Sequence, residues 1–293
     1  MAKFVFSAFA DEAGSSLDEQ IAALSRNGIG YIEPRMIDGK SFLTLSEKAL
    51  TDMRKKLDDA GIRVYSLGSP IGKYPIHEDF EIHKADFRKA LRAAEILGAS
   101  RMRIFSFFVR QEELGACREE VLSRMRYLLD EAKKAGVVLC HENESLIYGQ
   151  MPPEVEDLLT SLPDLKSVYD AANFIMNDAD AAEGMRATLP SLDYMHIKDA
   201  SYKEKIILPA GEGDGDIAKR LLEIDAARES TVTLTLEPHL KLFDGFAAID
   251  KHTLAGRYTF ANATESFDFA VKSLEKVLTS IGFRKGDNKE WTR

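Results

Sequence analysis

A repeated junction divides the chain: a helical pattern of apolar and polar positions, then a glycine, then a short apolar run. The junctions are Arg26-Asn27-Gly28-Ile29, Asp59-Ala60-Gly61-Ile62, Ile96-Leu97-Gly98-Ala99 and Lys134-Ala135-Gly136. Glycine directly after a helix accepts the left-handed backbone conformation that closes the last turn. Four copies at similar spacing indicate successive βα units.

The segments before the glycines have helical periodicity. In the second unit, Ala49, Met53, Leu57 and Ala60 fall on one face, and Lys and Asp fall on the other. Two segments, Ser16-Leu17-Asp18-Glu19 and Thr44-Leu45-Ser46-Glu47, fit a capping box, in which a hydroxyl and a carboxylate satisfy the first N–H groups of a helix. We therefore expect a helix to begin at each box.

Short apolar runs supply eight expected strands, at residues 4–7, 30–33, 64–67, 102–105, 137–140, 166–169, 192–197 and 231–236. Alternation of strands and helices makes the sheet parallel, and eight units favour a closed barrel over an open sheet. The predicted fold class is α/β, a single (β/α)₈ TIM barrel over residues 1–283. Residues 284–293 are polar and are expected to form a loose C-terminal tail.

Composition narrows the class of protein. The 293 residues fit one such barrel, and the net charge of −9 argues against a nucleic-acid partner. We find no signal-peptide core and no apolar run of the roughly 18 residues that a membrane span needs, so we expect a cytoplasmic protein. Cys117 and Cys140 are expected to be buried thiols. The sequence leaves homo-oligomer formation open.

Metal-capable side chains follow four consecutive expected strands. They are Glu142, Asp170, His196 and Glu237. The C-terminal ends of barrel strands converge on one mouth, and like charges gathered there need a compensating cation or proton. Three carboxylates and an imidazole suit one divalent metal ion, Mn²⁺ or Mg²⁺ first, with Co²⁺ or Zn²⁺ as alternatives.

Several motifs resemble those of the sugar phosphate isomerase/epimerase superfamily, the xylose-isomerase-like barrels. They are Glu142-Asn143, Tyr169-Asp170-Ala171-Ala172-Asn173-Phe174, His196-Ile197-Lys198-Asp199, Gly211-Glu212-Gly213-Asp214 and Leu236-Glu237-Pro238, and the resemblance covers nearly the whole chain. It implies that Glu142, Asp170, His196 and Glu237 are the metal ligands and that Glu142 and Glu237 also transfer protons. Asn173 stands where many members place a histidine that contacts substrate, so this chain keeps a hydrogen-bonding group but loses a titratable one.

Other polar residues are candidates for substrate binding. Lys198 follows His196 by two and points to the same side of its strand, although an ion pair with Asp199 or Glu212 is the alternative. His239, Arg35 and Lys73 also follow strands, and the two cations could bind an anionic group. We expect a structural role for His141, a flexible turn at Gly211-Glu212-Gly213, and no role for His77 or His83.

Together these features predict an enzyme, a metal-dependent isomerase or epimerase. It would act on a small sugar or sugar-like substrate, with or without a phosphate group, by proton transfer through a metal-stabilised enediolate. A dehydratase of the inosose or dehydroshikimate type would use the same ligands, and a non-catalytic sugar-binding barrel is a further alternative. An enzyme like endonuclease IV is disfavoured for two reasons. Its three-metal cluster needs more histidines at strand ends than this chain has, and binding of its DNA substrate needs a basic surface.

Overall fold

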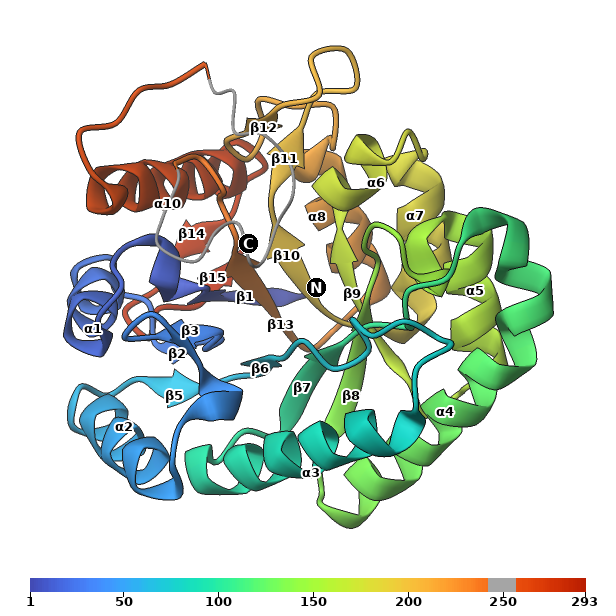
Figure 1. The fold of residues 1–293 in the computed structure, drawn as a ribbon. Coiled ribbons are helices and arrows are strands. Elements are labelled where there is room, and N and C mark those ends of the chain that lie inside the picture. The colour runs from blue at the N-terminus through green and yellow to red at the C-terminus, as the bar shows by residue number, and fades with distance from the viewer. Residues whose placement is uncertain (242–256) are drawn as a thin grey trace.

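The computed structural model describes residues 1–241 and 257–293. Figure 1 shows a central ring of strands enclosed by helices, and the (β/α)₈ barrel predicted from the sequence is confirmed. The barrel strands are β1 (Lys3–Ala8), β2 (Tyr31–Ile32), β5 (Arg63–Val64), β6 (Leu67–Gly68), β7 (Arg101–Ile104), β8 (Val138–Glu142), β9 (Lys166–Asp170), β10 (Leu192–Ile197) and β13 (Thr231–Leu236).

The ring of strands is parallel and closes between β1 and β2. The main sheet runs β1-β13-β10-β9-β8-β7-β6, and β2 pairs with β5. The backbone N–H of Glu33 donates to Ala8 O at 3.0 Å and joins β2 to β1. The N–H of Gly68 donates to Pro34 O at 3.0 Å and joins β6 to the chain beyond β2. The third expected strand is therefore present as two short pieces, β5 and β6.

Helices cover the outside of the ring (Figure 1). They are α1 (Leu17–Arg26), α2 (Glu47–Asp59), α3 (Phe80–Leu97), α4 (Leu114–Lys134), α5 (Pro152–Ser161), α6 (Ala171–Met176), α7 (Ala181–Thr188), α8 (Ile217–Ala227) and α10 (Ala263–Ser280). Short 3₁₀ turns are η1 (Ala10–Glu12), η2 (Phe42–Thr44), η3 (Gln111–Glu113), η4 (Tyr148–Gln150) and η5 (Leu189–Ser191). Within the described ranges, no helix combines the length and the apolar character needed to cross a membrane.

The helix boundaries follow the sequence signals with one exception. The four junction glycines all take positive φ, between 66° and 70°. The capping box of Ser16 and Glu19 is present at the start of α1. The box expected at Thr44 is wrong: Thr44 ends η2, and α2 begins after Ser46, whose side chain accepts the N–H of Ala49. Ser46 is therefore the N-cap residue, and Ala49, three residues on, offers no carboxylate to complete a capping box.

Residues 284–293 do not form the expected loose tail. They fold into an antiparallel hairpin of β14 (Arg284–Lys285) and β15 (Trp291–Thr292), and β15 pairs with β1 at Phe4. Trp291 is 5% exposed and its ring stacks on Phe6 with centroids 5.7 Å apart. One aromatic side chain therefore anchors an otherwise polar segment to the first barrel strand.

Two small hairpins extend the loops at the barrel mouth: β3 (Met36–Ile37) with β4 (Lys40–Ser41), and β11 (Asp199–Ala200) with β12 (Ile207–Leu208). The glycine-rich turn after β12 is not free as expected. The carboxylate of Asp199 accepts backbone N–H groups from Gly211, Gly213 and Gly215 at 3.0, 3.1 and 2.9 Å. A Cβ on Gly213 would lie 2.3 Å from that carboxylate, so the turn can close around Asp199 because this position is a glycine.

Candidate metal and active site

The four predicted ligands meet at the mouth of the barrel. Glu142 ends β8, Asp170 ends β9, His196 is the next-to-last residue of β10, and Glu237 follows β13. Each side chain offers one ligand atom, and these atoms all lie within 4.8 Å of one another. All four residues are buried. We call this set the central cluster.

His196 lies between the two glutamates. Its Nδ1 is 2.7 Å from Glu142 Oε1 and 3.1 Å from Glu237 Oε2. On the other side of the ring, Nε2 is 3.3 Å from Glu33 Oε2, and the Tyr194 hydroxyl donates to Glu33 Oε1 at 2.7 Å. A carboxylate behind a histidine fixes the orientation of the ring and is common in metal sites. Glu33 has this position, and sequence reasoning gave it no role.

Asp170 is held by the start of α6. Its Oδ1 accepts the N–H of Asn173 at 2.9 Å, and its Oδ2 lies 3.1 Å from Lys198 Nζ. The side chain of Asn143 donates to Asp170 O and accepts the Asp170 N–H. The Asn173 side chain donates to Asn143 O at 2.8 Å and approaches Glu142 Oε1 at 3.4 Å. Asn173 therefore lies beside the central cluster.

Each glutamate of the central cluster is bound by a buried arginine. Arg103 Nη1 donates to Glu142 Oε2 at 2.7 Å, and Arg35 Nη1 donates to Glu237 Oε1 at 3.0 Å. Arg35 also binds Asp11 at 3.0 Å. Both arginines are 5% exposed. Sequence reasoning selected Arg35 but missed Arg103, whose signal was a charged residue between two apolar residues, Met102 and Ile104, of a barrel strand.

The other candidate substrate-binding residues lie at different distances from the central cluster. Lys198 Nζ lies 3.1 Å from Asp170 Oδ2 and 3.6 Å from Glu237 Oε2, so it pairs with the central cluster and not with Asp199 or Glu212. His239 Nε2 is 3.4 Å from Glu237 Oε1 and 3.3 Å from Glu12 Oε1. Lys73 instead pairs with Glu144 at 2.8 Å and lies over the Phe105 ring.

His141, for which we expected a structural role, is a buried residue of barrel strand β8. Its Nε2 lies 2.9 Å from the Ser106 hydroxyl. Burial lowers the pKa of His141 to about 4. The side chain therefore belongs to the packing behind the mouth.

The electrostatics of the central cluster leave room for a cation. Burial raises the pKa of Asp170 to about 7, because Glu142 and Glu237 add to the effect and Lys198 offsets it only in part. Burial opposes ionisation of Glu142 as well, but His196 and Arg103 outweigh it and lower its pKa to about 2. A carboxylic acid that stays protonated near neutral pH beside ionised neighbours can exchange its proton for a metal ion.

Two oxygens of the central cluster have unused accepting capacity. Asp170 Oδ2 and Glu237 Oε2 are buried and receive no well-aligned hydrogen bond from the described residues, although both face Lys198 and Glu237 Oε2 also lies 3.1 Å from His196 Nδ1. Buried polar atoms are normally hydrogen-bonded, and such exceptions mark strain, an ion or a reacting group. The donor set and these two oxygens fit a divalent cation.

Comparison with known proteins agrees with this architecture. Residues 21–239 match the model of the xylose isomerase-like TIM barrel family, and the chain belongs to that family. No curated protein sequence matches the chain.

Solved structures share the fold at low sequence identity. The probable 3-DHS dehydratase AsbF of Bacillus anthracis is 15% identical, with a TM-score of 0.69 over 94% of this chain and 99% of that one. The D-psicose 3-epimerase of Clostridium cellulolyticum H10 is 13% identical, with a TM-score of 0.69 over 94% and 99%. The IOLI protein, solved with a zinc atom, is 15% identical, with a TM-score of 0.70 over 95% and 99%. These similarities establish the fold of the chain, and its reaction does not follow from them.

Proposed function

We propose that this protein is a metal-dependent isomerase or epimerase of a small sugar or sugar-like substrate. The observation that carries the proposal is the central cluster: three buried carboxylates and an imidazole from four neighbouring strands, with ligand atoms within 4.8 Å of one another. Glu142, Asp170, His196 and Glu237 would hold one divalent ion, with Mn²⁺ or Mg²⁺ as first candidates. When bound, the ion would supply positive charge that lowers the cost of forming an enediolate.

The proton transfers fall to the two glutamates. One removes a proton from the carbon next to the substrate carbonyl, and the other returns a proton to the opposite face or to the adjacent carbon. The position of both glutamates against His196 Nδ1, at 2.7 and 3.1 Å, supports this pairing, since it brings two carboxylates to one small volume. Arg103 and Arg35 bind their outer oxygens and keep each carboxylate oriented.

Substrate binding is assigned to the polar residues at the mouth. Lys198, Asn173 and His239 adjoin the central cluster and would bind hydroxyl or carbonyl oxygens. Arg35 would act through Glu237, which it contacts directly. Lys73, on the loop after β6, would meet the far end of the substrate or an anionic group on it, and this role rests on its position in the loop alone.

The test is exchange of substrate hydrogen with heavy water. Metal-supplemented protein is incubated with ketoses, hydroxypyruvate and inososes, and recovered substrate is analysed for deuterium. Glu142→Gln and Glu237→Gln should each lower the exchange rate by at least about 10²-fold, because general acid–base catalysis contributes that much. Glu119→Gln, at an exposed position of α4, is the matched control and should leave the rate unchanged.

Three outcomes would revise the proposal. Exchange that continues in both glutamine variants would show that Glu142 and Glu237 do not transfer the proton. Exchange that continues after chelation of all metal would show that the reaction does not need a metal ion. Loss of water, seen as a conjugated product that absorbs in the ultraviolet, would replace isomerisation with dehydration on the same ligands.

A further inference from the structure

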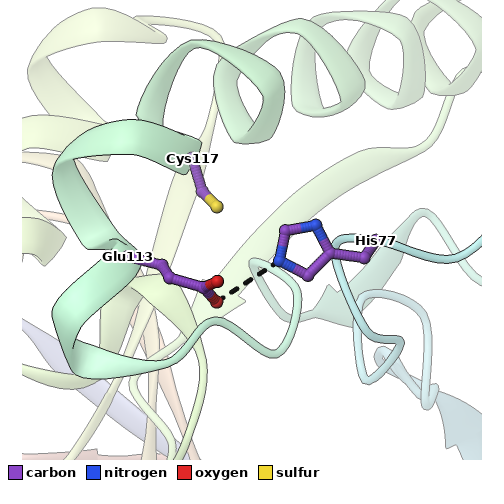
Figure 2. A group of neighbouring side chains, drawn as sticks. All are labelled: His77, Glu113 and Cys117. Atoms are coloured by element: carbon purple, nitrogen blue, oxygen red, sulfur yellow. Dashed lines mark hydrogen bonds and ion pairs between the residues drawn. The ribbon is translucent and has the colours of Figure 1, made fainter.

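A second group of metal-capable side chains lies away from the central cluster. It consists of His77, Glu113 and Cys117, whose ligand atoms all lie within 4.8 Å of one another. Figure 2 shows the three side chains pointing into one space, with His77 arriving from a loop and the other two from the start of a helix. We call this set the loop cluster. The sequence analysis assigned no role to His77 and treated Cys117 as a packing residue.

Helical structure and hydrogen bonds hold the backbone around the loop cluster in place. Glu113 ends η3 and Cys117 lies in the first part of α4, four residues on, so both occupy one helix face. The loop that carries His77 is joined to the same region, because the N–H of Ile76 donates to Phe108 O at 3.0 Å. On the other side of His77, Glu78 O accepts Arg124 Nη2 at 3.2 Å. His77 is thus held beside α4 by contacts on both sides.

From this geometry we propose that His77, Glu113 and Cys117 form a second divalent-metal site, selective for Zn²⁺ or a similarly borderline-soft cation. A thiolate, an imidazole and a carboxylate are the ligands that zinc uses, and three protein ligands leave a fourth position for water. The central cluster has oxygen and imidazole donors and no thiol, so the two sites favour different metals. The proposal does not depend on the reaction at the central cluster.

The charges of the loop cluster suit cation binding. Hydrogen bonds from Arg110 and His77 lower the pKa of Glu113 to about 2, so this ligand is ionised. Burial and the nearby Glu113 raise the pKa of the Cys117 thiol, which therefore holds its proton until a cation displaces it. The thiol lies near the N-terminus of the 21-residue α4, whose positive dipole end favours the thiolate that metal binding creates.

Arg110 does not block the site. It donates to both oxygens of Glu113, with Nε at 2.9 Å from Oε2. A carboxylate has about four lone-pair positions, so Glu113 can keep the arginine and still bind a cation with the remaining ones. His77 is exposed, which gives an ion a path to the site from solvent.

An ion bound at the loop cluster would add a cross-link between the loop that carries His77 and α4. Residues 69–79 connect β6 to α3 and carry both His77 and Lys73. Lys73 Nζ pairs with Glu144, two residues beyond the end of β8. Cross-linking this loop to α4 through a metal would hold the third and fourth βα loops of the barrel together at the mouth.

The test uses Co²⁺ as a spectroscopic substitute for zinc in the full-length, reduced, metal-free protein. Thiolate ligation gives an intense charge-transfer absorption in the near ultraviolet, which a site of carboxylates and imidazole cannot produce. We expect the band to report one thiolate-bound Co²⁺ per chain, to saturate by two equivalents of added Co²⁺ because the central cluster can take up the other, and to disappear on addition of Zn²⁺. Cys117→Ser should remove the band. His77→Ala, at an exposed position, should weaken Co²⁺ binding by at least about tenfold, since even indirect partners of a metal contribute that much.

Cys140→Ala is the matched control, because Cys140 is the other thiol of the chain and lies in the barrel interior among Val168 and Tyr194. It should keep the band. Absence of the band at saturating Co²⁺ would overturn the proposal, as would a band that survives Cys117→Ser or is lost in Cys140→Ala. Circular dichroism of each variant checks that the fold is retained. Deuterium exchange at the central cluster reports separately on the proposed reaction, so failure of either idea is visible alone.

Discussion

Individual residues at the mouth show what strand-end reasoning finds and what it misses. Glu142, Asp170, His196 and Glu237 were found because each follows a strand in a parallel barrel, a relation that the order of the sequence contains. Arg103 and Glu33 were missed. Arg103 meets Glu142 across 39 residues, and Glu33 meets His196 across 163. Such pairings depend on the register of the closed barrel, which periodicity does not give.

Removal of Arg103 should destabilise the metal-free protein. Arg103→Met leaves Glu142 buried with one counter-charge fewer, and breaking a buried ion pair from one side costs about 3–5 kcal/mol. Arg101→Met is the control on the same strand. Arg101 pairs with Asp193 but is 31% exposed, so its loss should cost within about 1 kcal/mol. The free energies of unfolding come from urea denaturation followed by circular dichroism.

Addition of Mn²⁺ should return part of the stability that Arg103→Met loses, because a cation at the central cluster replaces the missing positive charge. Equal losses in Arg103→Met and Arg101→Met would contradict the importance of the buried pair. A Mn²⁺ effect of the same size in the parent and in Arg103→Met would show that ion and guanidinium do not share Glu142.

At the scale of elements, the glycine junctions predicted the order of helices and strands. The interruption between β5 and β6 was not predictable, because the apolar run over residues 64–67 is continuous in sequence while the pairing partner changes from β2 to β7. The turn around Asp199 was also missed. Its glycines indicated a flexible segment, and the carboxylate that orders them lies earlier in the chain.

The C-terminal hairpin was missed for a related reason, since a single aromatic residue carries its packing. Trp291→Ala should lower the free energy of unfolding by about 3 kcal/mol, because large aromatic side chains in a core cost about 3–5 kcal/mol when truncated. Asp287→Ala, exposed in the same hairpin, is the control and should change stability by less than about 0.5 kcal/mol. A Trp291→Ala protein as stable as the control would mean that the hairpin is dispensable.

Over the whole molecule, negative charge concentrates at the barrel mouth. Among the described residues, the buried acids there are Asp11, Glu12, Glu33, Glu142, Asp170, Asp199 and Glu237, and the buried permanent cations are Arg35, Arg103 and Lys198. This excess explains the raised pKa of Asp170 better than the net charge of the chain does. The composition indicates that the protein carries a net negative charge, but only the fold shows that the buried acids gather at the barrel mouth.

Stability should fall as the pH falls from 7 to 5, in part because of two buried histidines. Burial lowers the pKa of both His83 and His141 to about 4. In the unfolded chain histidine takes up a proton below about pH 6.5, whereas the folded protein stays neutral there, so the stabilisation present above pH 6.5 is lost towards pH 4. Each histidine should contribute about 2 kcal/mol to the loss between pH 7 and pH 5.

His83→Gln isolates one of these contributions. The Gly72 N–H donates to His83 Nε2 at 2.9 Å, and a glutamine amide oxygen can accept the same bond without titrating. The stability difference between pH 7 and pH 5 should therefore shrink in His83→Gln relative to the parent protein. An unaltered difference in His83→Gln would show that His83 is protonated equally in both states.

Trp291 is the single tryptophan of the chain. Its indole fluorescence therefore reports whether the β14–β15 hairpin is packed against Phe6. Circular dichroism instead reports an average over all helices. If the hairpin detaches before the barrel opens, the two optical signals will separate along a denaturant gradient. Coincident curves would show that the ends of the chain and the ring of strands unfold as one cooperative unit.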